Sequence, residues 1–280
     1  MAIIVNSNLA SLNAQRNLES SQSSLNQSLQ RLSSGLRINS AKDDAAGLFI
    51  AEQLTRDIRG TNQAVRNASD GISLGQTAEG ALSEIGNNLQ RIRELAVQSA
   101  NATTGNRAGI QAEVDQLTQE ISRIIQTTEF AGNSLLNAAS GSDTLTFQVG
   151  ASGTASNQLT ISTVSMTGIA GYAASLVATG TINVSDAANA SAALSALSTA
   201  LDTVNQSRAT YGALQNRFEA VISNLQNYAE NLTAARSRIQ DADFAAETAN
   251  LTRSQILQQA GVSILAQANT LPQTALSLLG

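Results

Sequence analysis

Histidine, cysteine and tryptophan are absent from this 280-residue sequence, which has one proline, five phenylalanines and three tyrosines. Without cysteine or histidine there is no disulfide, no zinc site built on those residues, and no Ser-His or Cys-His nucleophile. Most metal-dependent and triad-dependent chemistry is thereby excluded. We therefore expect a protein that is not an enzyme, with no catalytic residues, no metal and no cofactor.

Charge is scarce as well. Charged residues make up 13% of the chain, against about 25% in a typical soluble domain. The formal net charge is −5 and the basic residues occur singly, so the clustered Lys and Arg of a nucleic-acid surface are missing. Residues 1–6 lack the cationic start of a secretory signal, and no apolar run approaches the roughly 18 residues that span a bilayer. We expect a soluble chain whose partners are neither nucleic acids nor membranes.

Both flanks of the chain carry a repeating apolar pattern. Apolar residues recur there at alternating steps of three and four, and a mean step of about 3.5 is the coiled-coil period. The rows consist of Leu18, Leu25, Leu29, Leu32 and Leu36; Leu82, Ile85, Leu89, Ile92 and Ala96; Ile110, Val114, Leu117, Ile121 and Ile124; and a long row from Leu194 to Leu232 through Leu197, Leu201, Val204, Tyr211, Leu214, Phe218, Val221, Leu225 and Tyr228. This pattern predicts a mainly α fold of long coiled-coil helices from both chain ends.

The length of the last row indicates an elongated molecule. As one helix at about 1.5 Å per residue, positions 194–232 extend about 58 Å. A compact chain of this size has a diameter of roughly 50 Å. We therefore expect an elongated helical bundle in which helices of both flanks pack lengthwise.

The middle of the chain has a different composition. Residues 140–185 are rich in Gly, Ser and Thr, and no basic residue occurs between Arg123 and Arg208. Residues 145–149 and 159–162 alternate apolar with polar side chains, the period of half-buried strands. We expect short β-hairpins in a small central insert, with helical structure over residues 1–137 and from about residue 187 onward.

Several short motifs predict where helices begin and end. Gly35 is a helix stop, and Ser-Ala-Lys-Asp at 40–43 is a capping box that opens the next helix. Residues 103–106, Thr-Thr-Gly-Asn, separate the second apolar row from the third. Pro272 is expected to interrupt the last helix or to lie in its first turn.

The remaining polar and glycine motifs favour structural roles. The glycines at 71, 75 and 80 do not form the GxGxxG pattern of a dinucleotide site. Adjacent carboxylates in a helix point in different directions, so an acid-base pair is poorly supported, and first-turn acids complement the positive helix start. Acidic residues cluster at two places, Asp43 with Asp44, and Asp241 with Asp243 and Glu247. We interpret both clusters as charges at helix starts rather than as metal ligands.

The two chain ends are apolar on one face, and they provide the candidate assembly residues. Chain ends fray unless something holds them in place. One interpretation is an intramolecular helix pair, and the other is burial against neighbouring copies of the chain, which would stabilise helices that are marginal alone. The residues concerned are Ile3, Ile4, Val5, Leu9 and Leu12 at one end, and Ile256, Leu257, Ile264, Leu265, Leu271, Leu276, Leu278 and Leu279 at the other.

Several long motifs resemble bacterial flagellin, the subunit of the flagellar filament. The N-terminal motifs are LSSGLRINSAKDDAAGL at 32–48, NASDGIS at 67–73, QTAEG at 76–80 and LQRIRELAVQSAN at 89–101. The C-terminal motifs are ARSRIQDADFA at 235–245, LAQAN at 265–269, PQ at 272–273 and LSLL at 276–279. The resemblance covers about residues 1–140 and 190–280, and the middle matches no pattern of the family.

The resemblance implies a five-part organisation and an extracellular filament. Residues 1–40 and 245–280 would be inner-core helices, flexible in the free subunit and lining the filament channel. Residues 41–140 and 191–244 would form the two halves of the wall domain. Residues 141–190 would be a short variable surface insert. The implied partners are further copies of the chain, the flagellar export chaperone, and hook-associated and cap proteins. Secretion is expected to run unfolded through the flagellar type III apparatus.

Flagellins are also sensed by a Toll-like receptor of animal hosts through the wall helices. The positions that match are Gln90, Arg91, Leu95, Gln98 and Glu113. An equally good interpretation is that Arg91 and Glu113 are exposed ion-pair partners on adjacent helices. The C-terminal leucines resemble the stretch that cytosolic inflammasome sensors recognise.

Two other functions compete with a filament subunit. One is a monomeric coiled-coil adapter or adhesin-like binding module that uses the insert to contact a ligand. The other is a subunit of the hook-filament junction, which the full set of terminal motifs argues against.

Overall fold

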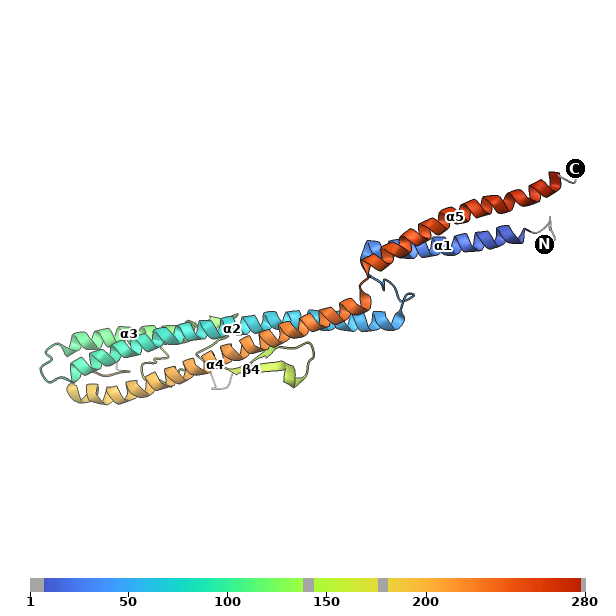
Figure 1. Ribbon diagram of the computed structural model, residues 1–280. Coiled ribbons are helices and arrows are strands. Elements are labelled where there is room, and N and C mark those ends of the chain that lie inside the picture. The colour runs from blue at the N-terminus through green and yellow to red at the C-terminus, as the bar shows by residue number, and fades with distance from the viewer. Residues whose placement is uncertain (1–7, 138–143, 176–180, 278–280) are drawn as a thin grey trace. The chain divides into compact units, whose positions relative to one another are not determined.

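The computed structural model describes residues 8–137, 144–175 and 181–277, with side chains as far as Thr270. The fold of these residues is mainly α, as the apolar rows predict (Figure 1). The helices are α1 Leu9–Ser34, α2 Ala45–Ala100, α3 Arg107–Thr127, α4 Ala187–Gln240 and α5 Phe244–Ser277. At about 1.5 Å per residue, the 54 residues of α4 extend about 81 Å. None of the described helices is both long and apolar enough to cross a bilayer.

Packing divides the chain into two units. The central unit is Ile58–Glu230, and the terminal unit combines Met1–Asp57 with Asn231–Gly280. Helices α1 and α5 belong to the terminal unit, α3 and the strands belong to the central unit, and α2 and α4 contribute residues to both.

The core of the central unit is built from the predicted apolar rows. On α2 all five residues of the row from Leu82 to Ala96 are buried, and on α3 the row from Ile110 to Ile124 faces the same cluster. The row on α4 is buried only as far as Phe218. Beyond it Val221, Leu225 and Leu232 are half-buried and Tyr228 is 48% exposed, so the last third of the row is less deeply buried than the rest.

The predicted hairpin lies over this core. Strand β3 Thr144–Gln148 pairs antiparallel with β4 Gln158–Ser162, with a short 3-10 turn at Ala155–Asn157 between them. The alternate residues Leu159 and Ile161 are buried. The ring of Phe147 meets that of Phe218 edge to face, with centroids 5.6 Å apart. Gly71 leaves room for this pair, because a Cβ there would lie 2.5 Å from Cζ of Phe218.

A second, smaller hairpin lies where the sequence predicted helix. Helix α3 ends at Thr127, and the two-residue strands β1 Glu129–Phe130 and β2 Asn133–Ser134 pair antiparallel. The turn between them has φ of 50° at Ala131 and 80° at Gly132. Positive φ at both central residues is the type I′ geometry that suits the twist of a hairpin. The predicted extent of helix over residues 1–137 is therefore too long.

The helix boundaries are mostly those predicted. Gly35 ends α1 in the left-handed region with φ of 72°, and Asn106 caps α3. The start of α2 differs from the predicted capping box at 40–43. Asp44 Oδ1 accepts a hydrogen bond from the Gly47 amide 2.9 Å away and so caps α2, whereas the Asp43 carboxylate accepts from the amide and the hydroxyl of Ser40 in the turn before the helix. The bond from the Ser40 side chain is the main cause of the lowered pKa of Asp43.

Helix α5 is continuous where a break was expected. It runs from Phe244 to Ser277, so Pro272 neither interrupts the helix nor lies in its first turn. Ahead of α5 the chain is tied to the segment that leaves α1, because the Ala242 amide donates to the Gly35 carbonyl at 2.9 Å and the Arg37 amide donates to Gln240 at 2.7 Å.

Candidate assembly surface

Helices α1 and α5 form an antiparallel pair within the terminal unit. Asn8 Nδ2 donates to the Ala268 carbonyl at 2.8 Å, at the start of α1 and late in α5. At the other end of the pair, Ser28 Oγ donates to Glu247 Oε1 at 2.6 Å. The described parts of the chain ends therefore form an intramolecular helix pair, but the apolar residues named for it, such as Leu9, Leu12 and Ile264, are not buried by it.

The buried seam of this pair follows the heptad spacing, but its residues are small or polar for the most part. On both helices the least exposed positions recur at steps of three and four. They are Ser11, Ala14, Leu18, Ser21, Leu25, Ser28 and Leu32 on α1, and Glu247, Leu251, Ser254, Gln258, Gly261, Leu265 and Ala268 on α5. Such a seam lets the helices approach closely and buries little apolar area.

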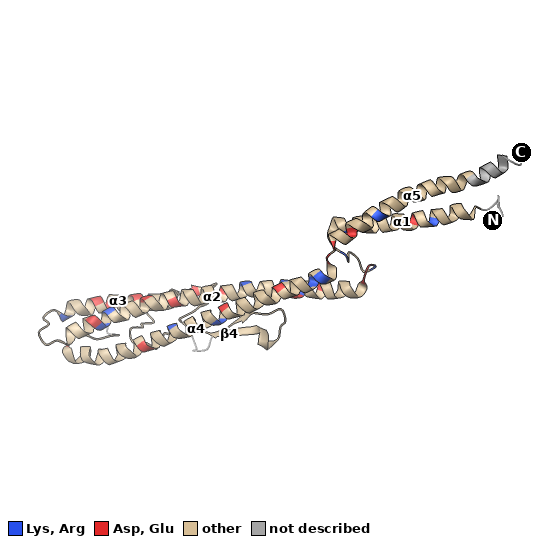
Figure 2. Ribbon diagram, in the orientation of Figure 1, with Lys and Arg blue, Asp and Glu red and all other residues tan. Residues whose placement is uncertain are grey.

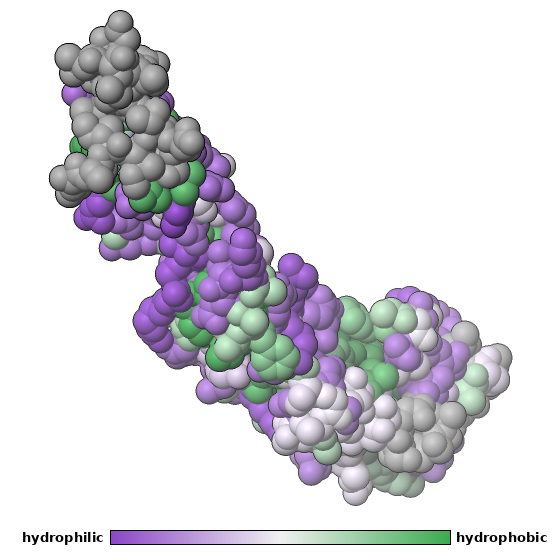
Figure 3. Space-filling view, turned by 90° about the vertical axis from the view of Figure 1, so that its right-hand side faces the viewer, coloured by the Kyte–Doolittle hydropathy of each residue, from purple (hydrophilic) through white to green (hydrophobic). Residues whose placement is uncertain are grey.

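Large apolar side chains lie instead on the outside of the terminal unit. Leu9 is 67% exposed and Ile264 is 59% exposed. Among the described residues, ten of the twelve exposed large apolar side chains belong to the terminal unit, and Figure 3 shows such hydrophobic surface next to the grey residues at the chain ends. The ten are Leu9, Leu12, Leu29, Phe49, Ile50, Phe244, Ile256, Leu257, Val262 and Ile264, which we call the terminal apolar surface.

The predicted assembly residues fall into three groups. Leu9, Leu12 and Ile264 belong to the terminal apolar surface, whereas Leu265 is half-buried in the seam. Ile4, Val5, Leu278 and Leu279, together with the side chain of Leu276, lie outside the described residues. Sequence reasoning missed Phe49, Ile50, Phe244 and Val262 as surface residues, and their immediate neighbours in the sequence give no common signal for them.

The predicted receptor residues lie on α2 and α3 of the central unit. Gln90, Arg91, Gln98 and Glu113 are exposed. Leu95 differs, because it is only 3% exposed and belongs to the core. Its side chain is therefore not part of this exposed surface in the structure.

Arg91 and Glu113 form the ion pair that the sequence suggested. Nε and Nη2 of Arg91 lie 3.0 and 2.8 Å from Oε1 of Glu113, and Nη1 lies 3.1 Å from Oε2 of Glu94. The bond to Glu113 is the main cause of the raised pKa of Arg91. Both side chains are about half exposed, so the pair contributes little to folding and leaves a charged, accessible surface.

Among the acidic residues near the start of α5, Asp243 has the helix-start role predicted for it, whereas Glu247 contacts another helix. Asp243 Oδ1 accepts from the amides of Ala245 and Ala246 and so caps α5, while Glu247 contacts Ser28 and Arg31. No group of three or more acidic ligands that could hold a metal occurs among the described residues. Figure 2 shows acidic and basic residues interspersed along the helices.

Comparisons with known proteins agree with these features. The family model for the bacterial flagellin N-terminal helical region matches residues 5–141, and that for the bacterial flagellin C-terminal helical region matches residues 194–279. The chain is 45% identical to a flagellin of Halalkalibacterium halodurans over 279 residues, which cover 99% of this chain and all of that protein. It is 38% identical to flagellin B of Vibrio cholerae over an alignment of 378 positions that covers both chains completely.

One solved structure supports the fold alone. A flagellar hook-associated protein of Vibrio parahaemolyticus is 14% identical and superposes with a TM-score of 0.60, covering 71% of this chain and all of the other. The identity is too low to carry a function, whereas the two family models and the full-length relatives are decisive. The chain therefore belongs to the bacterial flagellin family, whose members are the structural subunits of the extracellular flagellar filament.

Proposed function

We propose that this chain assembles into its filament by burying the terminal apolar surface between copies. The observation that carries the proposal is the concentration of exposed large apolar side chains in the terminal unit. Burying one such side chain fully is worth about 1.5–3 kcal/mol. Ten of them on one copy supply enough driving force for association, even after the cost of ordering the chain is deducted.

Repetition in a filament makes this surface effective. A heterologous contact that does not close into a ring generates an open helical array, and each added copy then repeats the same burial. A polar, small-residue seam inside the pair supports the same mechanism, because it leaves the large apolar residues free to face outward. The seam thus holds α1 and α5 together while other copies complete the burial.

The five-part organisation is part of the proposal. We propose inner-core helices over residues 1–40 and 245–280, wall halves over 41–140 and 191–244, and a surface insert over 141–190. The export chaperone would cover the C-terminal end before assembly, and hook-associated and cap proteins would contact the same ends at the limits of the filament. No catalytic role is proposed, because the composition lacks histidine and cysteine.

Host recognition would use the exposed part of the wall surface. Gln90, Arg91, Gln98 and Glu113 support contact with a Toll-like receptor, which would meet an arginine already paired with two carboxylates. Leu95 would contribute by supporting the helix from below rather than by contact. Inflammasome sensors would read the C-terminal leucines, Leu276, Leu278 and Leu279.

Seeded polymerisation tests the assembly mechanism. Leu12→Asp places a charge on the terminal apolar surface, and we expect it to abolish sedimentation of polymer after seeding. The matched control is Asn13→Asp, which adds the same charge at the adjacent exposed position and should polymerise as the unmodified chain does. Normal polymerisation of Leu12→Asp would contradict the proposal, and an unmodified chain that stays small after seeding would favour the adapter.

A further inference from the structure

The seam between α1 and α5 is nearly repetitive, so its apolar residues do not define which residues face each other. On α1 the leucines at 18, 25 and 32 are seven residues apart, and so are Ser21 and Ser28. From Leu18 to Leu32 a slip of one heptad would therefore replace leucine by leucine and serine by serine, and only nearer the start of α1 would Ser11 and Ala14 stand where Leu18 and Ser21 stand now. The hydrogen bond from Gln258 to Gln22 does not discriminate either, because Gln15 lies one heptad before Gln22.

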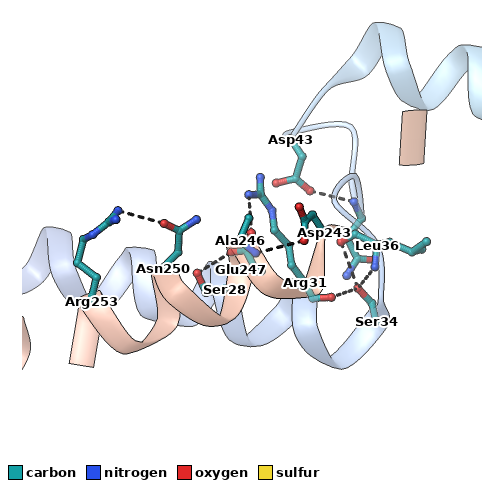
Figure 4. A network of polar contacts seen from close by, with 11 residues as sticks. Ser28, Arg31, Ser34, Leu36, Asp43, Asp243, Ala246, Glu247, Asn250 and Arg253 are labelled. Atoms are coloured by element: carbon teal, nitrogen blue, oxygen red, sulfur yellow. Dashed lines mark hydrogen bonds and ion pairs between the residues drawn. The ribbon is translucent and has the colours of Figure 1, made fainter. Parts of the chain in front are cut away.

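Besides the Asn8–Ala268 hydrogen bond at the end of the pair, one contact is not repeated along the seam. Glu247 is 8% exposed, accepts a hydrogen bond from Ser28, and lies 3.6 Å from Nη1 of Arg31 (Figure 4). After a slip of one heptad Ser21 would offer an equivalent hydroxyl, but Ser24 would stand where Arg31 stands now. Glu247 would then be buried without a cation. A slip in the opposite direction would carry it to Gly35, where α1 has ended.

We propose that the Arg31–Glu247 ion pair fixes the register of the α1–α5 pair. A buried polar or charged contact is a known means of selecting one register among several that apolar packing allows. The pair is poorly suited to a purely stabilising role, because Nε of Arg31 is buried without an acceptor among the described residues. The Arg31 side chain is 25% exposed and that of Glu247 is 11% exposed, so much of both charged groups is withdrawn from water. An incompletely paired contact of this kind gains little stability, but a slipped state that leaves Glu247 without its cation is penalised.

The register determines which exposed apolar residues of α1 and α5 lie next to each other for contact with other copies. This consequence rests on the proposed function. The contact of Asn8 with Ala268 places Leu12 at the level of Ile264, four residues further in on each helix. A slip of seven residues moves α5 by about 10.5 Å along α1. The two helices would then no longer present Leu12 and Ile264 together on the terminal apolar surface.

Engineered disulfides can measure the register directly, because the native chain has no cysteine. The full-length chain with Cys at Gln22 and Gln258 reports the observed register, and the chain with Cys at Gln15 and Gln258 reports the one-heptad slip. A third chain, with Cys at Ser20 and Gln258, tests for disorder, since position 20 lies on another face of α1. Each is oxidised mildly, in the soluble and the sedimented fraction, and the intrachain disulfide is quantified.

We expect the observed-register disulfide to form about tenfold more than the slipped one, a ratio that corresponds to about 1.4 kcal/mol. Arg31→Ser, which installs the side chain that the slip would bring, should reduce this ratio to about one, and Arg31→Lys should keep most of it. The matched control is Arg253→Ser, because Arg253 contacts only Asn250 of its own helix in the described interactions and should leave the ratio unchanged.

A tenfold ratio that survives Arg31→Ser would overturn the inference. So would equal formation of all three disulfides in the unsubstituted background, because the helices would then have no register to fix. The readout does not require polymer. A chain that never sediments but keeps the Arg31-dependent ratio in solution would contradict the proposed function while supporting this inference.

Discussion

The central and terminal units both have helices with heptad-spaced apolar residues, but they differ in whether their large apolar side chains are buried. Among the described residues, 29 of the 34 buried apolar residues belong to the central unit, and five belong to the terminal unit. The exposed large apolar residues divide the other way, ten to two. The central unit therefore completes its own core, whereas the terminal unit leaves its largest apolar residues on the surface.

This difference shows that heptad spacing alone does not say where an apolar residue is buried. In the central unit the residues at the heptad positions are large and aliphatic, so the helices that carry them bury one another. In the terminal unit the inward positions hold many serines and alanines, and large residues such as Leu29 and Ile256 lie off the seam. A helix pair of this kind is stable as part of an assembly and marginal alone.

The sharpest way to break the comparison is to truncate one apolar side chain in each unit. Phe218→Ala removes a fully buried ring that packs on Phe147, so the free energy of unfolding should fall by about 3–5 kcal/mol. Leu12→Ala should change it by less than about 0.5 kcal/mol, because this side chain is already exposed in the free chain. Urea denaturation of the unpolymerised protein measures both, and equal destabilisation would contradict the division into two kinds of unit.

Substituting two glycines of α2 by alanine tests how tightly the central unit is packed around each of them. Gly71→Ala places a Cβ 2.5 Å from the ring of Phe218 and should cost about 1–3 kcal/mol. Gly80 has no atom within 4 Å of a Cβ built there, so Gly80→Ala should instead stabilise the helix by about 0.5–1 kcal/mol. Shifts of opposite sign in the thermal midpoint are expected, and a neutral Gly71→Ala would show that the core around Phe218 is loosely packed.

The smallest expected effect concerns a surface ion pair. The hydrogen bond from Arg123 lowers the pKa of Glu120 below its ordinary value of 4.5. A carboxyl with a lowered folded pKa stabilises the protein above its unfolded pKa, and this contribution is lost as the pH falls through the folded pKa. Relative to Glu120→Gln, the native chain should be more stable by about 0.3–0.5 kcal/mol at pH 7. Thermal melts should show this gap closing below pH 4.5, and a gap that persists at low pH would exclude the ion pair as its cause.

Most of the fold could be predicted because it follows from periodicity. The steps of three and four located the helices, and the alternation at 145–149 and 159–162 located β3 and β4. The β1–β2 hairpin was missed because its turn uses Ala131 at positive φ, where asparagine or glycine is the usual signal. A Ser40–Asp43 capping box was predicted to open α2 because the Ser-x-x-Asp spacing fits that motif, whereas the structure caps the helix with Asp44.

The site was predicted less completely, for a physical reason. The leucines at 18, 25 and 32 marked part of the seam, but its serine, alanine, glycine, glutamate and glutamine positions give no hydropathy signal. Leu95 was assigned to the receptor surface by resemblance to the family, and the single heptad stripe of α2 did not mark it as buried. Helix α2 has contacts with both α3 and α4 through Arg91 and Glu79. A helix packed on two sides buries a broader stripe than a heptad seam.

Amide hydrogen exchange of the full-length chain, before and after seeded polymerisation, tests the central claim most directly. If other copies complete the burial of the terminal apolar surface, amides of α1 and α5 should exchange fast in the free chain and become strongly protected in polymer. Core amides of α2 and α3 should be protected in both states. Strong protection of α1 and α5 in a dilute chain that stays monomeric would contradict the account.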